Sequence, residues 1–375
     1  MIEHVVRRGL EHAGSMNLLK RAAEDGPKVE LPTWGAILLA VTFIGTGIFL
    51  TLVEYTLKDL IATLAMIETP SAAITVSTPD EPASKDEKEG LLETAPTITL
   101  VHQKPITSSI RATMRHLKSQ AGRMARLRGF RIHALYAFAF SSVLNMLNAA
   151  VPMRFPLRMV IISALGGAVC APIHAAWTNK VVSTPSATTF WQRIPSRSSW
   201  KVLALPAAVN AAMPYFALFV AHASACLLGL HKVKDVSGYT STQWTFLILR
   251  VVAVIAISIT CSLFLCLPAI VTLVRTEASI LPEDQDTIVP FDRSFDGKVV
   301  PKILGGTGAI KFLDAWRSFN WEARRRLLKH YVKSFLVVFG MIFVVAHILA
   351  FELFVVMGPQ LGKLLAEAKH QGYIS

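Results

Sequence analysis

Cysteine, charge and catalytic signatures are all scarce in this chain of 375 residues. Its cysteines lie in apolar segments, without a Cys-x-x-Cys pair or a histidine at ligand spacing; they are Cys170, Cys226, Cys261 and Cys266. This placement indicates small buried side chains rather than disulfides or a metal site. Charged residues make up 17% of the chain and hydrophobic residues 53%. That balance is too apolar for a soluble domain of this length.

Signatures of enzymes and of cofactor sites are missing. The chain has no Gly-x-Ser-x-Gly and no His-Glu-x-x-His, the patterns that carry a serine nucleophile or a catalytic zinc. The glycine-rich run Gly305–Gly308 lacks the lysine of a phosphate-binding loop. We therefore expect a protein that is not an enzyme and has no catalytic residues, no metal and no cofactor.

Long apolar segments are what the chain has in abundance. At about 20 residues and ~1.5 Å rise per residue, a helix crosses a roughly 30 Å hydrocarbon core. Six segments reach or approach this length: Trp34–Leu57, Ile132–Met153, Leu157–Trp177, Val202–Leu230, Phe246–Val274 and Ser334–Met357. The loops between them alternate in length, which groups the spans into three tandem helical hairpins. The sequence thus predicts an all-α polytopic membrane protein with six transmembrane helices in a pseudo-threefold arrangement.

The same pattern divides the chain into parts. We expect a basic amphipathic N-terminal segment at 1–31, hairpin repeats at 32–156, 157–240 and 241–360, and a C-terminal tail at 361–375. The N-terminal segment lacks the short apolar core of a secretory signal. Within the first repeat, residues 69–95 are polar and of mixed charge, which predicts a disordered insertion.

The net charge of +13 is unevenly distributed. Lysine and arginine gather in the loops after the first, third and fifth spans, whereas the loops after the second and fourth spans hold few. The positive-inside rule then places the three basic loops on the cytoplasmic or matrix side, with both termini opposite. Basic residues next to apolar spans favour a membrane surface over nucleic acid as the partner.

One basic segment has a lipid-facing composition. Residues Ala315–Tyr331 combine Trp316, Phe319 and Trp321 with several arginines. This mixture suits a surface helix lying at an anionic headgroup layer. We expect anionic membrane lipids as partners, contacted by Arg324, Arg325 and Arg326.

The ends of the odd-numbered spans carry a weakly repeated pattern. Pro172 and Pro268 lie late in the third and fifth spans, and Glu54 lies at the end of the first. A proline there removes one backbone hydrogen bond and predicts a kink. A glycine and arginine element precedes the second span, at Gly122, Arg128 and Gly129. Three tandem hairpins with these features resemble the mitochondrial solute carrier family, whose odd helices carry Pro-x-[Asp/Glu]-x-x-[Lys/Arg].

The resemblance implies a six-helix barrel in the mitochondrial inner membrane that carries a small metabolite; another organelle membrane stays open. The family closes one side with acid–base pairs, and this chain departs from that pattern. His174 and Ile270 stand at the acid positions, and Trp177 and Leu273 at the basic ones. A ring reduced to Glu54 does not close as a salt-bridge network. Either Trp177 packs against Leu273 as a hydrophobic gate, or alternating access is lost.

Polar side chains inside the spans are further candidates, because they are costly in lipid. The substrate-binding or gating candidates are Glu54, His174, Trp177, Asn210, His222 and Glu352. Structural alternatives remain, such as an interfacial anchor for Glu54 and helix–helix hydrogen bonds for His222 and Glu352. Two function classes stay open. One is a carrier-like transporter of a small metabolite; the other is a non-transporting membrane scaffold or assembly factor that keeps the fold without its ionic gate.

Overall fold

The computed structural model describes residues 32–69, 72–77, 97–102, 104–151, 155–233, 238–282, 284–300 and 304–370. By contacts, the chain separates into two units. The first unit joins Met1–Val53 with Phe335–Ser375, and the second is Glu54–Ser334. The described residues are helical apart from one two-stranded antiparallel sheet and the connecting loops. The predicted N-terminal segment 1–31 lies outside the described residues.

Six described helical segments are long and apolar enough to cross a membrane. They are Thr33–Ile67, Arg123–Ala150, Arg158–Val182, Arg197–Leu227, Ser241–Ser279 and Trp321–Gly358. Each overlaps one predicted span, so the prediction of six apolar helices is confirmed. In five of the six, less than a third of the most apolar stretch is buried by the protein itself. This organisation fits an integral membrane protein, whose apolar surface faces lipid.

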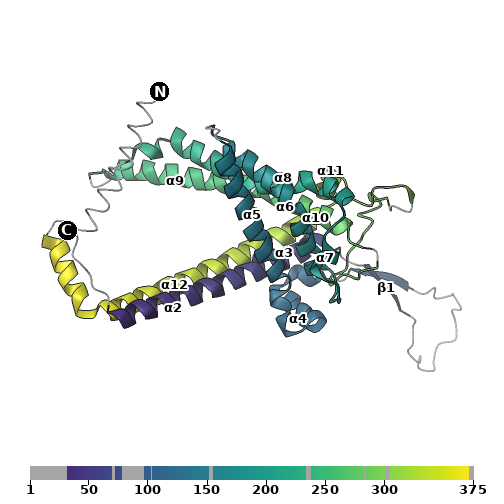
Figure 1. The fold of residues 1–375 in the computed structure, drawn as a ribbon, viewed down its shortest axis with the longest axis horizontal. Coiled ribbons are helices and arrows are strands. Elements are labelled where there is room, and N and C mark those ends of the chain that lie inside the picture. Colours follow the sequence, from purple (N-terminus) through teal and green to yellow (C-terminus); the bar gives the residue numbers. More distant parts are fainter. Residues whose placement is uncertain are drawn as a thin grey trace, which may run out of the picture. The chain divides into compact units, whose positions relative to one another are not determined.

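The first unit is built from α2 (Thr33–Glu54) and the part of α12 (Trp321–His370) that starts at Phe335, and the two lie side by side in it (Figure 1); the first turns of α12 belong to the second unit. The helices approach closely because Gly35 has no side chain: a Cβ there would lie 2.2 Å from Val356 Cγ1. The Thr42 hydroxyl donates a 2.9 Å hydrogen bond to Glu352 Oε1. Helical geometry in α12 is interrupted at Gly358, where φ is 36° and ψ −120°. The helix resumes to His370, so the predicted tail at 361–375 is helical over its first ten residues.

The second unit contains the remaining elements. They are η1 (Tyr55–Ile61), α3 (Ala62–Ile67), β1 (Ala72–Ser77), β2 (Thr97–His102), η2 (Ile106–Ser108), α4 (Ile110–Ala121), η3 (Arg123–Leu127), α5 (Phe130–Ala150), α6 (Arg158–Val182), α7 (Phe190–Arg193), α8 (Arg197–Leu227), η4 (Leu230–Lys232), α9 (Ser241–Cys261), η5 (Ser262–Cys266), α10 (Leu267–Ser279) and α11 (Phe312–Arg317). The elements η1 and η5 are π-helical turns within longer helices.

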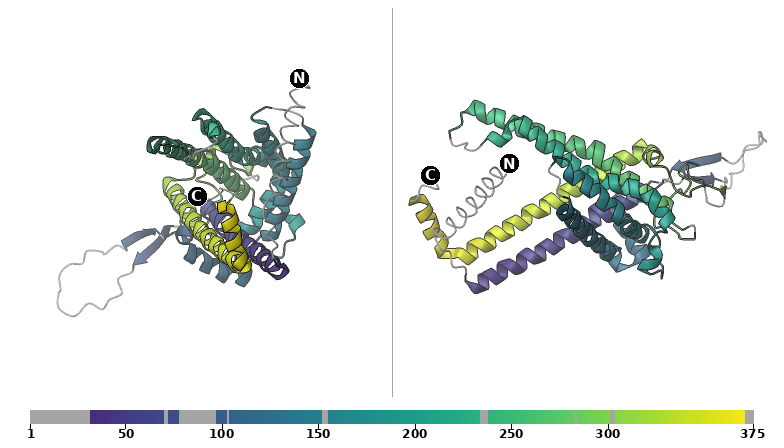
Figure 2. Two further views of the ribbon diagram at one scale, coloured as in Figure 1. Left: turned by 90° about the vertical axis from the view of Figure 1, so that its left-hand side faces the viewer. Right: turned by 45° about the horizontal axis from the view of Figure 1, so that its top comes forward.

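Consecutive long helices of the second unit pack against one another. Helix α6 contacts α5 and α8, and α8 contacts α9 and α10 (Figures 1 and 2). The α6–α8 approach is close because Gly167 faces Ala207 and Ala211; a Cβ at Gly167 would lie 2.5 Å from the Ala207 carbonyl oxygen. Small residues of this kind let membrane helices pack tightly. The pair corresponds to the predicted second hairpin, whereas the pseudo-threefold arrangement of all three hairpins stays a prediction.

Residues 286–290, in the loop after α10, contact the loops that follow α3 and α6. Their backbone forms hydrogen bonds with Val182, the last residue of α6, at 2.9 Å, with Thr184 beyond α6 at 2.8 Å, and with Thr69 after α3 at 2.9 Å. The ring of His116 on α4 donates to the same segment at 2.7 Å. The connections that follow α3, α6 and α10 therefore lie at one end of the second unit. A shared end agrees with the common side predicted for the three basic loops.

Two sequence predictions are corrected by the fold. The proposed disordered insertion contains a paired strand, because Ala72–Ser77 lies antiparallel to Thr97–His102. This strand is rich in β-branched residues, which favour extended structure; residues 78–96 lie outside the described chain. The predicted surface helix Ala315–Tyr331 is two helices. Helix α11 ends at Arg317, and the Asn320 side chain caps α12 by accepting a 2.9 Å hydrogen bond from the Ala323 N–H.

Candidate functional site

The helix of each odd-numbered span has an irregular or proline-containing stretch. The first span contains η1 (Tyr55–Ile61), and the fifth contains η5 (Ser262–Cys266) directly before Pro268. Pro172 lies inside α6, which continues as one α-helix to Val182. The two predicted prolines therefore have different local structures. Pro268 lies at the start of α10, after the π-helical turn η5, whereas Pro172 lies inside the continuous helix α6. Such π-turns occur frequently at functional sites.

A buried acid–histidine pair joins α6 to α10. The Nδ1 atom of His174 lies 2.7 Å from Glu277 Oε1, and the two side chains are 9% and 0% exposed. The hydroxyl of Thr178, one turn after His174, donates to Glu277 Oε2. Both carboxylate oxygens thus have a partner, as a buried carboxylate requires.

Aromatic rings from three elements surround this pair. The Tyr136 ring on α5 lies edge-to-face with the His174 ring, with centroids 4.9 Å apart. On α6, Trp177 lies 5.1 Å from His174, and its Nε1–H donates a 3.1 Å hydrogen bond to the Tyr55 hydroxyl of η1. The Tyr55 hydroxyl in turn donates to the Arg128 carbonyl. These contacts tie η1, α5 and α6 together around His174.

A second acid–histidine pair adjoins these rings. The Nε2 atom of His133 on α5 lies 3.9 Å from Asp59 Oδ2 of η1. The His133 ring lies 5.0 Å from the Tyr55 ring and 5.6 Å from the Trp177 ring. The Asp59 and His133 side chains are partly exposed, at 36% and 29%. We name the whole set the His174 cluster; its members are Tyr55, Asp59, His133, Tyr136, His174, Trp177, Thr178 and Glu277.

Glycine is required where the loop before α5 meets this cluster. Gly129 has a φ of +78°, and a Cβ there would lie 3.1 Å from Trp177 Cδ1 and 3.2 Å from the Tyr55 hydroxyl oxygen. Gly122 also has a positive φ, +76°, but nothing lies within 4 Å of its would-be Cβ. Of the predicted loop motif, Gly129 is thus in direct contact with the cluster, whereas Gly122, with φ 76° and ψ −168°, provides a backbone conformation that is open essentially to glycine alone.

Buried arginines hold the end of α6. Arg128 donates from Nε to the Lys180 carbonyl at 2.7 Å and from Nη2 to the Ser183 carbonyl. Arg193 of α7 donates to Asn179 Oδ1 at 2.7 Å. Burial lowers the pKa of Arg193. Arg128, the third member of the predicted loop motif, therefore satisfies carbonyl groups at the C-terminal end of α6.

A further arginine connects α10 to α3. Arg275 donates from Nη1 to the Met66 carbonyl at 3.1 Å and from Nη2 to the Ser318 hydroxyl at 2.9 Å. Its guanidinium carbon lies 4.8 Å from the Phe295 ring centroid and 5.4 Å from that of Phe319. Cation–π contacts of this kind stabilise a desolvated guanidinium. The ends of α3, α6 and α10 thus meet through specific polar contacts.

The loop after α10 carries a hydrogen-bonded carboxylate. Asp292 accepts 2.9 Å hydrogen bonds from the backbone N–H groups of Ser294 and Asp296. Burial alone would raise the pKa of Asp292, but these hydrogen bonds outweigh it and hold the pKa below its ordinary value. Asp292 is therefore ionised in the folded loop at neutral pH.

Of the predicted substrate-binding or gating residues, only His174 and Trp177 come together. Glu54 pairs with Lys58 in the next turn, and both side chains are well exposed, at 48% and 38%. Asn210 is half-buried in α8, and His222 is exposed, with its Nε2 3.6 Å from Cys226 Sγ. In the first unit, Glu352 accepts the hydrogen bond from the Thr42 hydroxyl described above.

The predicted hydrophobic gate is not formed as expected. Trp177 belongs to a large apolar cluster with Tyr55, whereas Leu273 packs in another cluster with Leu203 and Ala207 of α8. Leu273 therefore faces α8 rather than Trp177.

The acidic members of the His174 cluster are those that sequence reasoning misses. The predicted first and fifth spans end at Leu57 and Val274, whereas the helices continue to Ile67 and Ser279. Asp59 and Glu277 thus fall just beyond the apolar runs. A signal was available in His174, because a histidine inside an apolar span needs a polar partner on a neighbouring helix.

Comparisons with family models, with curated proteins and with solved structures find no match to this chain. Among the described residues, no group of three or more His, Cys, Asp or Glu side chains could hold a metal ion. The geometry supplies two acid–histidine pairs: one is hydrogen-bonded between α6 and α10, and the other has its atoms 3.9 Å apart between α5 and η1.

Proposed function

We propose that this protein is a carrier-like transporter of a small metabolite, with the His174 cluster as the gate that closes one side of the path. The pair of His174 and Glu277 carries the proposal. Ionisable groups within membrane spans are costly and commonly mark solute or proton pathways. An apolar pair of similar volume would hold α6 to α10 at least as well. A pair that can separate and re-form instead suits helices that move apart during transport.

We extend the proposal to a place among mitochondrial solute carriers, with three hairpins in pseudo-threefold arrangement in the mitochondrial inner membrane. Supporting it are the irregular or proline-containing stretches in all three odd spans and the meeting of α3, α6 and α10. His174 stands at the family's acid position. Its acidic partner, Glu277, is on the next odd span. This chain would thus keep a contact between an acidic and a basic side chain of two odd helices, with a histidine at the position where the family has an acid.

Uptake into proteoliposomes tests the proposal. The full chain is reconstituted and screened against a panel of radiolabelled carboxylates, amino acids, nucleotides and inorganic ions. We expect saturable uptake of at least one solute. Glu277→Gln should lower that uptake by tenfold or more, in line with the ~1.4 kcal/mol that a tenfold change represents.

Asp284→Asn is the control, because Asp284 is exposed in the loop after α10 and lies outside the His174 cluster; it should keep uptake within about twofold of wild type. Size-exclusion profiles and melting temperatures of both variants separate a transport defect from misfolding. A folded wild-type protein that transports none of the panel would contradict the proposal and favour the non-transporting scaffold.

A further inference from the structure

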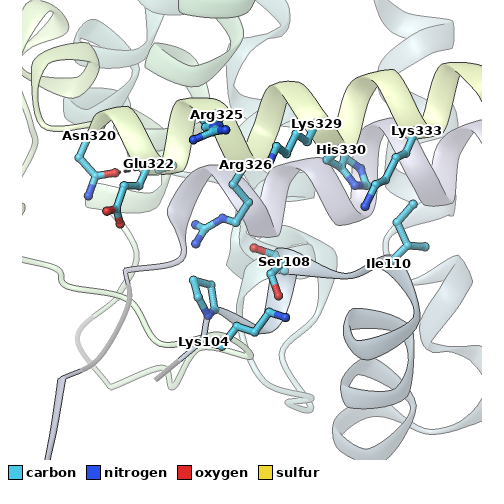
Figure 3. A pocket seen from close by; sticks show the side chains of 13 residues that line it. Lys104, Ser108, Ile110, Asn320, Glu322, Arg325, Arg326, Lys329, His330 and Lys333 are labelled. Atoms are coloured by element: carbon cyan, nitrogen blue, oxygen red, sulfur yellow. Dashed lines mark hydrogen bonds between the residues drawn. The ribbon is translucent and has the colours of Figure 1, made fainter. Parts of the chain in front are cut away.

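A second site lies apart from the His174 cluster, beside the first turns of α12. A cavity of about 510 Å³ lies between α12 and the segment that leads into α4. Its basic lining residues are Lys104, Arg325, Arg326, Lys329 and Lys333, whereas Glu322 is its carboxylate. Figure 3 shows Arg326 and Lys333 extending from α12 toward the segment that carries Lys104 and Ser108. All these residues belong to the second unit.

The positive charge of this pocket is largely uncompensated. Arg326 lies 3.7 Å from Glu68 Oε2 and donates to the Glu68 carbonyl at 3.2 Å, but its buried Nε has no hydrogen-bond partner in the described chain. Within the same described residues, no carboxylate forms an ion pair with the other four cations. A pocket of this kind attracts an anion.

The spacing of the cations on α12 strengthens this argument. Arg325, Lys329 and Lys333 follow one another at intervals of four residues, which places them on one face of the helix. Like charges at this spacing destabilise a helix by a few tenths of a kcal/mol per pair. An anion bound between them and Lys104 would turn that repulsion into attraction.

The number of cations also indicates which anion. A carboxylate brings a single charge, whereas a phosphate monoester brings about −1.5 to −2 and three acceptor oxygens at neutral pH. Lysine and arginine bind phosphoryl oxygens through charge-assisted hydrogen bonds. The N-terminal end of α12, at Trp321, adds the positive end of a helix dipole. We propose that this pocket binds a phosphoryl group, from either a soluble phosphate compound or a phospholipid headgroup.

The pocket differs from the lipid contact expected from sequence. Arg324, one of the three predicted headgroup residues, donates to the Phe319 and Trp316 carbonyls at 2.8 and 3.0 Å and stacks 4.0 Å over the Trp316 ring. It does not line the pocket. Lys104, which is far from α12 in sequence, does.

Binding titrations on the full detergent-solubilised chain test the proposal. The probes are inorganic pyrophosphate and dihexanoyl phosphatidic acid below its micelle concentration, with dihexanoyl phosphatidylcholine as the uncharged comparison. The pocket variant is Lys104→Gln/Lys333→Gln, which alters two exposed lysines. The control is Lys118→Gln/Lys311→Gln, two exposed lysines that do not line the pocket.

We expect one probe to bind saturably, with a dissociation constant raised about tenfold or more in the pocket variant and unchanged within about twofold in the control. Tighter binding of pyrophosphate identifies a soluble phosphate compound, and tighter binding of phosphatidic acid identifies a lipid headgroup. Equal weakening in both variants, or no binding of either anionic probe to wild type, overturns the proposal. Lys329→Gln provides a second pocket variant should the double variant not fold.

Discussion

Removing the carboxylate of Glu277 should have a large effect on stability. The side chain is 0% exposed and accepts hydrogen bonds from both His174 and Thr178. Glu277→Ala would leave the two donors without an acceptor in a buried site. Hydrogen bonds to charged groups contribute about 1.5–3 kcal/mol each, and breaking a buried pair costs about 3–5 kcal/mol. We expect a loss of about 3 kcal/mol in the free energy of unfolding.

The assay is denaturant unfolding in mixed micelles, with His174→Ala and the double variant completing a double-mutant cycle. A coupling energy of about 1 kcal/mol or more is expected for two residues in direct contact. Glu54→Ala is the comparison: its exposed pair with Lys58 should contribute no more than about 0.5 kcal/mol. A loss for Glu277→Ala as small as that for Glu54→Ala would refute the assignment of a buried, fully bonded pair.

Three further predictions concern other parts of the chain. Gly129→Ala should destabilise the protein by about 1–3 kcal/mol, because it combines a left-handed conformation with close neighbours. Gly229 has the same left-handed conformation, with φ 74° and ψ 16°, but a Cβ there would lie 3.9 Å from its nearest neighbour, so Gly229→Ala should cost only about 1–2 kcal/mol. Thermal unfolding of both variants gives the comparison. Thr42→Val should weaken the α2–α12 contact by about 0.6 kcal/mol and at most ~1.7, measured by the same micelle unfolding. On a Glu352→Ala background, which removes the acceptor, Thr42→Val should have no effect, and an undiminished loss there would contradict the hydrogen bond. Asp292 has a lowered pKa in the folded state, so its contribution to stability is present above the ordinary aspartate pKa of about 4 and is lost as pH falls through the lower folded value. Asp292→Asn should therefore flatten this part of the curve of unfolding free energy against pH. An unaltered curve would count against this role of Asp292.

Hydropathy predicts the six apolar helices because lipid imposes a length and a composition that few other structures share. It predicts their ends poorly. Helix α12 begins at Trp321, well before the apolar run that starts near Ser334, because Asn320 caps it and Arg324 bonds to the preceding turn. Polar residues at a helix end are stabilised by the adjoining loops, and a hydropathy window does not register these contacts.

The candidate site is predicted only in part for the same reason. His174 and Trp177 stand out as polar or aromatic residues inside an apolar span. Glu277, the partner of His174, and Asp59, the partner of His133, lie in charged sequence at the ends of other helices, where a carboxylate is ordinary. Only the packing of α6 against α10, and of α5 against η1, brings these carboxylates to histidines.

The proposed gate is tested most directly by locking it without altering the His174 pair. Ser183 and Thr287, which follow α6 and α10, lie opposite one another in an antiparallel bridge flanked by hydrogen bonds on both sides. Such a pair has Cα atoms about 4.5 Å apart, within the range that a disulfide spans. Ser183→Cys/Thr287→Cys is made in a background without the native cysteines, and solute uptake is measured before and after reduction. The gate predicts that oxidation abolishes uptake and reduction restores it; equal uptake in the two states would contradict it.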